Sequence, residues 1–371
     1  MPFDVHDFPD ASRLDRAATR QSRRLVAVWL FTVAAMIMVM IVLGGVTRLT
    51  GSGLSIMEWE PLKGILPPTS DAEWHRLFAL YQKIPQYALV NEGFGLAGFK
   101  HIFWLEWTHR LWGRLIGVVF LLPMVWLWAT ARIERRLMPR LGLLFVLGGL
   151  QGAVGWFMVS SGFFPDSTAV SPYRLVIHLA FALVLYAAII WTGLSALYQR
   201  RDRSPVSPML YRLAIGSLAM VSLTILAGGF TAGTHAGLTY NTFPLMDGQL
   251  VPDGYTMLHP FIRNITENIA AVQFDHRLVA TITLILVSTL AVAGWRAGLP
   301  RPLMGCLGVA VLGQYLLGVT TLLLEVPVPI AAMHQCGAVI LLTVVLVLVH
   351  RVSHAPHTRQ DAEPVLETTG S

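Results

Sequence analysis

Four histidines lie inside long apolar stretches of the sequence, where an imidazole is costly unless it has a partner. Each lies about two helical turns from the start of its stretch, and they form two similarly spaced pairs, His109 with His178 and His276 with His334. Two imidazoles at one depth that face each other can ligate a six-coordinate heme iron. The four histidines therefore predict two sites that each bind a heme through two axial ligands.

The histidines also allow two other interpretations. They could form hydrogen bonds across a helix bundle without binding a metal. Zinc is less favoured, because no further cysteine, histidine or carboxylate cluster completes a tetrahedral site around either pair. The remaining histidines fall in loops, at interfaces or near the cytoplasmic side, and none fits the paired pattern: His6, His75, His101, His235, His259, His350, His354 and His357.

A carboxylate lies close to the first pair. Glu106 precedes His109 by one helical turn, so the two side chains share a helix face. A carboxylate at that depth is expensive unless it is functional or paired. The structural alternative is a salt bridge to a nearby cation, for which the candidates are Arg110, Arg114 and Lys100.

The second pair lacks this carboxylate. Gln273 occupies the position that corresponds to Glu106, and Asp275, beside His276, is not in the same register. The two sites should therefore differ chemically. Arg110 and Arg277, which follow the first histidine of each pair, could neutralise heme propionates or extend to the membrane interface.

Membrane-spanning helices must position these residues. The chain has 371 residues, of which 54% are hydrophobic and 13% are charged, as in all-α polytopic membrane proteins. Eight segments are long enough to span a bilayer. They are approximately Leu25–Val46, Ile102–Trp128, Leu141–Ser160, Pro172–Leu197, Leu210–Thr231, Val272–Trp295, Leu303–Leu324 and Pro327–His350.

Arginines alternate between the two sides of these segments, which predicts that both termini are cytoplasmic. This distribution accounts for the net charge of +6, so the sequence requires no nucleic-acid partner. The arginines precede the first span, follow the last, and fill the second, fourth and sixth connections: Arg13, Arg16, Arg20, Arg23, Arg24, Arg132, Arg135, Arg136, Arg140, Arg200, Arg201, Arg203, Arg296, Arg301, Arg351 and Arg359.

The N-terminal segment favours a bacterial inner membrane. The first span is too long for a signal peptide and has no obvious cleavage site, so we expect it to be retained. The only cysteines, Cys306 and Cys336, lie within spans, so the external loops have no disulfide available. Four acidic residues argue against a mitochondrial transit peptide, which is normally poor in acid: Asp4, Asp7, Asp10 and Asp15.

The two halves of the chain resemble each other, which predicts two parallel repeats of four spans, each a four-helix bundle. We therefore expect a cytoplasmic segment 1–24, a first bundle 25–197 with an external loop 48–101, a second bundle 210–350 and a disordered tail 351–371. The repeated elements are Gly44-Gly45-Val46-Thr47 with Gly228-Gly229-Phe230-Thr231, Gly53-Leu54-Ser55 with Gly237-Leu238-Thr239, Pro61-Leu62-Lys63-Gly64 with Pro244-Leu245-Met246-Asp247-Gly248, His109-Arg110-Leu111 with His276-Arg277-Leu278, Gln151 and Gly155 with Gln314 and Gly318, and His178 with His334.

Two further features are local. Trp74, Leu77, Phe78 and Tyr81 fall at helical spacing in the first external loop, which predicts a short amphipathic helix on the membrane surface or a lid over a site. The glycines of the third and seventh spans are interpreted as plain helix-packing contacts.

Three motifs resemble those of the heme A synthase family. They are GGVTRLTGSGLS at 44–55, FWLEWTHR at 103–110 and QFDHR at 273–277. The similarity extends from about Arg20 to Arg351. Some bacterial members carry a cysteine pair in the first external loop; the loop 48–101 has none, so the chain resembles the alphaproteobacterial and mitochondrial-type branch.

The resemblance implies a function. Members convert heme O to heme A for cytochrome c oxidase, oxidising the C8 methyl group to a formyl group by successive hydroxylations followed by loss of water. By this resemblance, His276 and His334 would ligate a resident heme b, and His109 and His178 would hold the substrate heme O. Glu106 would be the catalytic carboxylate, and a heme O synthase would be a partner.

The resemblance leaves the chemistry open. If both histidines stay on the substrate iron, no position is left for dioxygen, and we hypothesise that electrons pass to the neighbouring heme b while water attacks the oxidised methyl carbon. Glu106 would then stabilise the developing cation or accept a proton. Dissociation of one histidine would reopen an iron–oxygen route. The sequence identifies no electron acceptor, and a homo-oligomer is compatible with it.

Two other functions compete with this one. A diheme b-type cytochrome that carries electrons across the membrane is the main alternative, but it needs hemes near both faces, whereas all four histidines lie toward one. A transporter that relays protons through buried histidines would need broken helices at the bilayer midplane. The second and sixth spans show no obvious interruption there, although Pro123 could kink the second.

Overall fold

The computed structural model describes residues 11–60, 63–198 and 206–353. The described chain contains eight helices that are long and apolar enough to cross a membrane. Predictions that fall on 1–10, 61–62, 199–205 and 354–371, including most of the proposed C-terminal tail, lie outside the described residues. The eight helices are α1 (Ala11–Leu49), α4 (Leu96–Ala129), α5 (Met138–Val159), α6 (Pro172–Leu197), α7 (Pro208–Gly233), α9 (Ile269–Arg296), α10 (Arg301–Leu323) and α11 (Val328–Ser353).

All eight predicted spans are helices, and several are longer than predicted. Helix α1 starts at Ala11, so the described part of the proposed N-terminal segment is helical. Helices α4 and α9 are each continuous, and α4 runs through Pro123 without a break. The broken helices that a transporter would require are therefore missing from these two elements.

The helix starts follow ordinary capping chemistry. Proline occupies one of the first two positions of α5, α6, α7 and α10, where the lack of an N–H costs nothing. Ser207 and Asn268 cap α7 and α9, each accepting a hydrogen bond from a backbone N–H of the first turn. These signals explain why the start of α6 at Pro172 agrees with the prediction.

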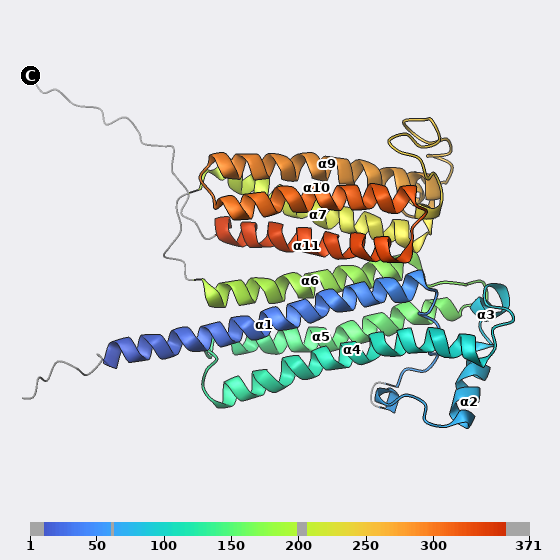
Figure 1. Ribbon diagram of the computed structural model, residues 1–371, viewed down its shortest axis with the longest axis horizontal. Helices are drawn as coiled ribbons and strands as arrows, with labels where there is room; N and C mark the ends of the chain where they lie inside the picture. Colours follow the sequence, from blue (N-terminus) through green and yellow to red (C-terminus); the bar gives the residue numbers. More distant parts are fainter. Residues whose placement is uncertain (1–10, 61–62, 199–205, 354–371) are drawn as a thin grey trace, which may run out of the picture.

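The helices are arranged as two sets of four (Figure 1). In the first set, α1 and α5 each pack on both α4 and α6; in the second, α7 and α10 each pack on both α9 and α11. The packing order is thus the same in both sets, as expected for a repeat. The start of α1 and the end of α11 lie at one end of the molecule, and the long loops lie at the other. The assignment of the two sets as separate domains stays a prediction.

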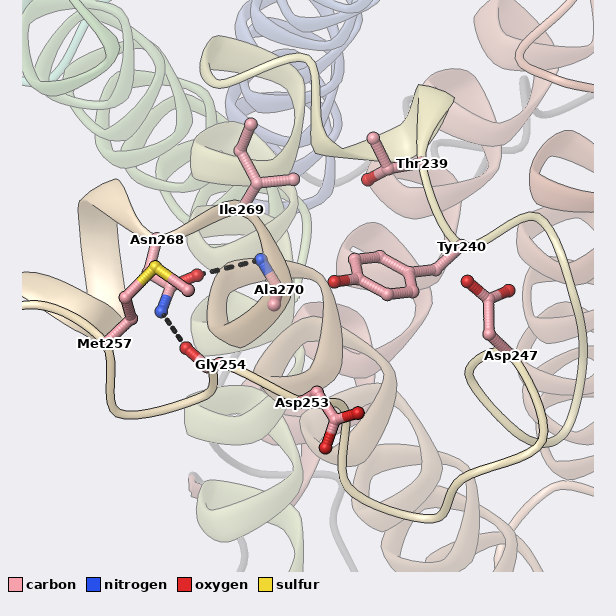
Figure 2. A pocket seen from close by; sticks show the side chains of 9 residues that line it. All are labelled: Thr239, Tyr240, Asp247, Asp253, Gly254, Met257, Asn268, Ile269 and Ala270. Atoms are coloured by element: carbon pink, nitrogen blue, oxygen red, sulfur yellow. Dashed lines mark hydrogen bonds between the residues drawn. The ribbon is translucent and has the colours of Figure 1, made fainter.

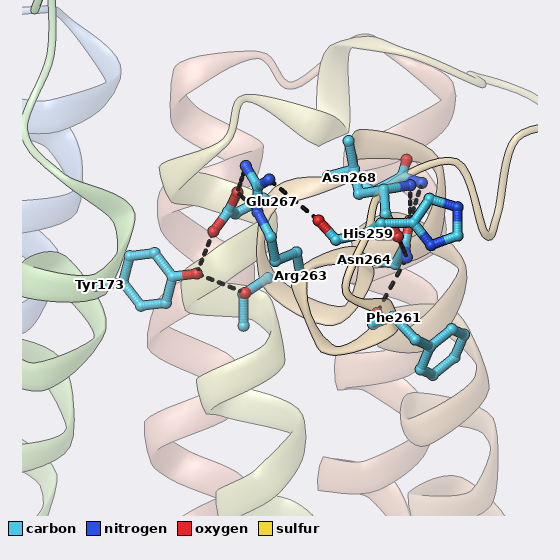
Figure 3. A network of polar contacts seen from close by, with 9 residues as sticks. Tyr173, His259, Phe261, Arg263, Asn264, Glu267 and Asn268 are labelled. Carbon is cyan, nitrogen blue, oxygen red and sulfur yellow. Dashed lines mark hydrogen bonds and ion pairs between the residues drawn. The ribbon is translucent and has the colours of Figure 1, made fainter.

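The two sets also pack against each other, through α6 with α7 and through α11 with α1 and α6. The Tyr186 hydroxyl lies 2.7 Å from the Thr343 hydroxyl, which joins α6 to α11. At the loop end, the Tyr173 hydroxyl at the start of α6 donates to Glu267 of α8 (Asn264–Glu267), as Figure 3 shows. Polar contacts therefore join the halves along their whole length.

The first external loop folds onto the extended start of α4. It contains α2 (Asp71–Tyr81) and α3 (Pro85–Leu89), so the predicted amphipathic helix is confirmed. Its Trp74 and Tyr81 are buried against Phe99 and Phe103 of α4. Because α2 covers this part of α4, the helix can begin at Leu96, earlier than hydropathy alone predicted.

Candidate functional site

The four predicted histidines occupy equivalent places in the two sets of helices. His109 is on α4 and His178 on α6; His276 is on α9 and His334 on α11. The charge of His178 acts on His109, and that of His334 acts on His276, so the two members of each pair lie in the same region of their set. Their ligation of a common iron stays a prediction.

Each imidazole rests against a glycine of a neighbouring helix. A Cβ atom built on Gly44 of α1 would lie 3.1 Å from Nε2 of His109, and one on Gly228 of α7 would lie 3.0 Å from Cε1 of His276. A Cβ on Gly155 of α5 would lie 3.0 Å from the Cε1 atom of His178. On Gly318 of α10 the corresponding distance to Cε1 of His334 is 2.8 Å.

These distances are shorter than ordinary contacts, so a side chain at Gly318 would displace its histidine ring, and one at the other three glycines would need the ring to move slightly. Gly155 and Gly318 were interpreted from the sequence as plain helix-packing residues. The structure shows that they seat the histidines instead. The sequence offered one sign of this role: Gly155 and Gly318 each follow a glutamine, Gln151 or Gln314, at the same spacing in both halves.

Glu106 is buried, with 3% of its surface exposed, and both its oxygens are occupied. Oε2 accepts hydrogen bonds from the Ser55 hydroxyl at 2.7 Å and the Ile56 backbone N–H at 2.9 Å. Oε1 accepts from Arg110, with Nη2 at 2.6 Å and Nε at 3.1 Å. The salt bridge that the sequence offered as the structural alternative is thus present.

Gln273 occupies the equivalent position in the other half with reversed polarity. Its amide Nε2 donates to the backbone carbonyls of Ala236 and Thr239, in the loop after α7. Its Oε1 accepts from Nη2 of Arg277 at 3.1 Å. A side chain at this position holds the loop in both halves, but only the first half does so with a negative charge.

Arg110 and Arg277 both clamp the external loops. Nη1 and Nη2 of Arg110 donate to the carbonyls of Glu58 and Ile56, and those of Arg277 donate to the carbonyls of Thr242 and Tyr240. Their predicted contact with heme propionates stays a prediction, because most of their hydrogen-bonding capacity is already used within the protein.

Arg48 is a cation that the sequence analysis did not single out as a site residue. It follows Gly44 by one helical turn and therefore lies on the same face of α1, nearer the loop end than His109. Among the described residues its buried Nη2 atom has no hydrogen-bond partner. Burial, and then the charge of Arg48, lower the pKa of His235 in the loop after α7. The corresponding residue of the second half is Ala232.

Asp275 contributes to the second external loop and not to the histidine pair. Its Oδ1 accepts a hydrogen bond from the Tyr255 hydroxyl at 2.8 Å. Burial, followed by this contact with Asp275, raises the pKa of Tyr255 to about 12, so the hydroxyl keeps its proton at neutral pH.

A separate pocket of about 510 Å³ lies between this loop and the start of α9 (Figure 2). Its lining includes Tyr240, Asp247, Asp253 and Asn268, and none of the predicted site residues. The pocket is therefore distinct from the histidine pairs.

Among the described residues no three His, Cys, Asp or Glu side chains are grouped to hold a metal ion. Axial ligation of a heme needs only two imidazoles, held by different helices of a bundle. Such ligation by the two histidine pairs stays a prediction.

One buried histidine falls outside this pattern. His350, near the opposite end of α11, is 2% exposed, and its Nε2 lies 3.1 Å from the Ser195 hydroxyl of α6. It joins two helices at the end remote from the sites. The sequence suggested a place near the cytoplasmic side but not its burial.

The fold defines the class: a multi-pass helical membrane protein with eight helices long and apolar enough to cross a bilayer. Residues 27–346 match the family described as cytochrome oxidase assembly protein, and the chain belongs to this family. It is 62% identical over 340 residues to the heme A synthase of Granulibacter bethesdensis, covering 91% of this chain and 90% of that protein.

Other relatives are similar over the same length. The chain is 48% identical to heme A synthase 2 of Acidiphilium cryptum, covering 88% of this chain and 91% of that protein. It is 45% identical to the heme A synthase of Parvibaculum lavamentivorans, with 90% and 96% covered. Relatives that bear the name heme A synthase thus match nearly the whole chain, as the sequence motifs predicted.

Proposed function

We propose that this chain is a heme A synthase, an oxidoreductase that acts on a CH group. It oxidises the C8 methyl group of heme O to a formyl group, by successive hydroxylations followed by loss of water, for assembly of cytochrome c oxidase. The relatives named above support this function. The geometric support is the single carboxylate, Glu106, beside one of two otherwise matching histidine pairs.

This difference assigns the two sites. The half that contains Glu106 is the one equipped for chemistry, so His109 and His178 hold the substrate heme O. His276 and His334 hold the resident cofactor, heme b, which supplies a one-electron redox centre when bound. The neutral Gln273 leaves that second site without a reactive group.

Glu106 acts on the substrate by its charge. Three groups of the protein direct four hydrogen bonds at its oxygens: the Ser55 hydroxyl, the Ile56 N–H and the Arg110 guanidinium. These hydrogen bonds fix the carboxylate in place, which suits stabilisation of positive charge developing at the methyl carbon. To accept a proton it would have to release one of these donors, and the Ser55 hydroxyl, 2.7 Å away, is the one that can rotate.

Arg48 anchors a carboxylate of the substrate. It lies one turn from His109 on the loop side and has a buried N–H group without a partner in the described chain. A heme propionate is an anion that could fill this role. Arg48 is better placed for this contact than Arg110, whose Nε, Nη1 and Nη2 atoms all donate within the protein.

The protein lies in the bacterial inner membrane with both termini in the cytoplasm. The arginine distribution supports this orientation, and it puts the histidine pairs and long loops on the external side. Heme O synthase is the expected source of substrate. A homo-oligomer stays compatible with these assignments.

Pigment analysis tests the function. The chain is co-expressed with a heme O synthase in a host that makes no heme A, and the extracted hemes are separated. We expect heme A to appear only when both proteins are present. If the purified chain contains low-spin heme but only heme B and heme O are recovered, the electron-carrier alternative is correct.

A further inference from the structure

Two glutamines contact the second histidine of each pair in the same way. Nε2 of Gln151 on α5 lies 3.2 Å from Nδ1 of His178, and Nε2 of Gln314 on α10 lies 3.1 Å from Nδ1 of His334. Each amide nitrogen also donates to the backbone carbonyl of the same histidine, at 2.9 Å. The repetition shows that the contact belongs to the architecture of both sites.

These contacts determine which ring nitrogen is engaged. Nδ1 lies within hydrogen-bond distance of the glutamine amide, so Nε2 is the ring nitrogen left without a hydrogen-bond partner among the described residues. Gly155 and Gly318 lie one turn after the glutamines and bring the same two helices close to the rings. The glutamine and the glycine together hold each ring from one side.

The amides are themselves held. The Oε1 atoms of Gln151 and Gln314 are both buried, and neither has a hydrogen-bond partner among the described residues. In the second half, a Cβ on Gly337 would collide with Oε1 of Gln314, so the amide is packed against the backbone of α11. A buried, unpartnered carbonyl oxygen is costly, and it points to a role that the amide still has to fulfil.

We propose that Gln151 and Gln314 are positioning residues that orient His178 and His334 and set how strongly these rings donate electrons to a bound iron. The inference rests on the proposed function, since it requires that the histidines ligate heme. A histidine that binds iron through Nε2 carries its proton on Nδ1. Turning the amide end for end would present Oε1 to that proton, since the two ends of an amide have nearly the same shape, and would exchange for it the hydrogen bond that Nε2 donates to the histidine's backbone carbonyl. A hydrogen bond accepted from the outer nitrogen makes the ring a stronger ligand.

The reduction potential of heme b tests the proposal without relying on activity. The full chain is purified from a host without heme O synthase, so that heme b is the heme it contains. Gln314→Leu removes the acceptor and is expected to raise the midpoint potential, while Gln314→Glu strengthens it and is expected to lower the potential. Each shift should correspond to about a tenfold change in the Fe³⁺/Fe²⁺ equilibrium, or ~59 mV for a one-electron couple. A merely structural role would not give opposite signs.

Thr320→Val is the control on the same helix as Gln314: the Thr320 side chain is exposed and its hydroxyl donates to the backbone carbonyl of Leu316, so the variant should leave this potential unchanged. If Gln314→Leu loses heme but keeps its helical content, while Thr320→Val keeps both, the positioning role is still supported. If both Gln314 variants keep the wild-type potential, or both shift it in one direction, the proposal is wrong although the histidine sites stand. Absence of low-spin heme from the wild-type chain would overturn the proposed function instead.

Discussion

At the scale of single residues, the two halves differ at one side-chain position, where Glu106 has an oxygen atom and Gln273 has an amide nitrogen. Glu106 and Gln273 have nearly the same shape and both hold an external loop, but the first accepts hydrogen bonds where the second donates them. The loops are built to match: Ser55 and Ile56 present donors, and Ala236 and Thr239 present carbonyls. The charge of Glu106 is therefore not needed to hold a loop, which favours a role in the reaction.

The Glu106→Gln variant tests the negative charge of Glu106 separately from its hydrogen bond with Arg110. An amide at position 106 can still accept from Arg110, as Gln273 does from Arg277, but its NH2 group would face the Ile56 N–H, so we expect the fold to persist with stability lowered by about 1 kcal/mol. Heme A output should fall about a hundredfold, with heme O or its hydroxylated intermediate accumulating, because a fixed charge near the reacting carbon is lost. Chromatography of extracted hemes measures this, together with thermal unfolding of the purified protein.

Two further variants give the controls. Glu106→Ala should lose the activity and, in addition, up to about 3 kcal/mol of stability, because Arg110 is left without its buried partner. Gln273→Glu should destabilise the second loop, since a carboxylate would face two carbonyl oxygens. Wild-type heme A output from Glu106→Gln would reduce Glu106 to a structural ion-pair partner.

The buried Nη2 atom of Arg48, which has no hydrogen-bond partner in the described part of the chain, leads to a prediction about substrate binding. Arg48→Gln should weaken the binding of heme O about tenfold, the loss expected for one charge-assisted hydrogen bond. Titration of the purified protein with heme O and with its propionate dimethyl ester measures the effect. The ester should bind equally to the wild type and the variant, because it lacks the charges that Arg48 recognises. An equal loss for both ligands would show that Arg48 only supports the fold.

At the scale of elements, the close approach of helices at glycine determines where the imidazoles can lie. Position 318 should not accept any side chain: in Gly318→Ala, the new methyl group would push His334 out of line, at a cost of about 1–3 kcal/mol. Retention of low-spin heme should weaken by roughly 10- to 100-fold. Gly313→Ala, on the same helix with no atom within 4 Å of the new Cβ, is the control and should keep its heme. Equal heme loss in both variants would mean that α10 tolerates alanine at neither position. It would then not support a specific role of Gly318 in positioning His334.

Much of the helix arrangement and of the candidate site could be predicted from the sequence. Hydropathy gave the eight spans, and matching motifs gave the histidine pairs and the asymmetry at Glu106. The seating glycines could not be predicted, because a glycine in a span looks the same whether it faces lipid, a helix or an imidazole. The early start of α4 also escaped prediction, since it depends on Trp74 and Tyr81, which pack there from a distant part of the chain. Arg48 and the buried His350 likewise needed the packing of separate helices.

At the scale of the whole molecule, each half completes the surroundings of the other. On α1, Gly44 faces His109 of its own half, while a Cβ on its neighbour Gly45 would collide with Gln335 of α11. Gln335 directly follows His334, and its Nε2 donates to the backbone carbonyl of Ile41 on α1 at 2.8 Å. On α7, Gly229 lies in a similar way against α6, where a Cβ would be 3.3 Å from Leu179, the residue after His178. Gly44 and Gly45, adjacent residues of α1, thus contact His109 of the first site and Gln335, which is next to His334 of the second site.

This arrangement predicts an effect across the halves. Gly45→Val, a change in the first half, should displace Gln335, break its hydrogen bond to Ile41 and disturb the heme b held by His334. The overlap falls on the far end of the flexible Gln335 side chain, so the cost is that of overpacking and one lost hydrogen bond, about 1–3 kcal/mol, and heme b should be retained with a shifted potential and low-spin spectrum. Gly44→Val should instead impair the binding of heme O by His109 and leave heme b unchanged. Redox titration of the heme-b-loaded protein, followed by titration with heme O, distinguishes the two variants. If Gly45→Val affects only heme O, the halves are independent bundles whose shared surface does not reach the second site.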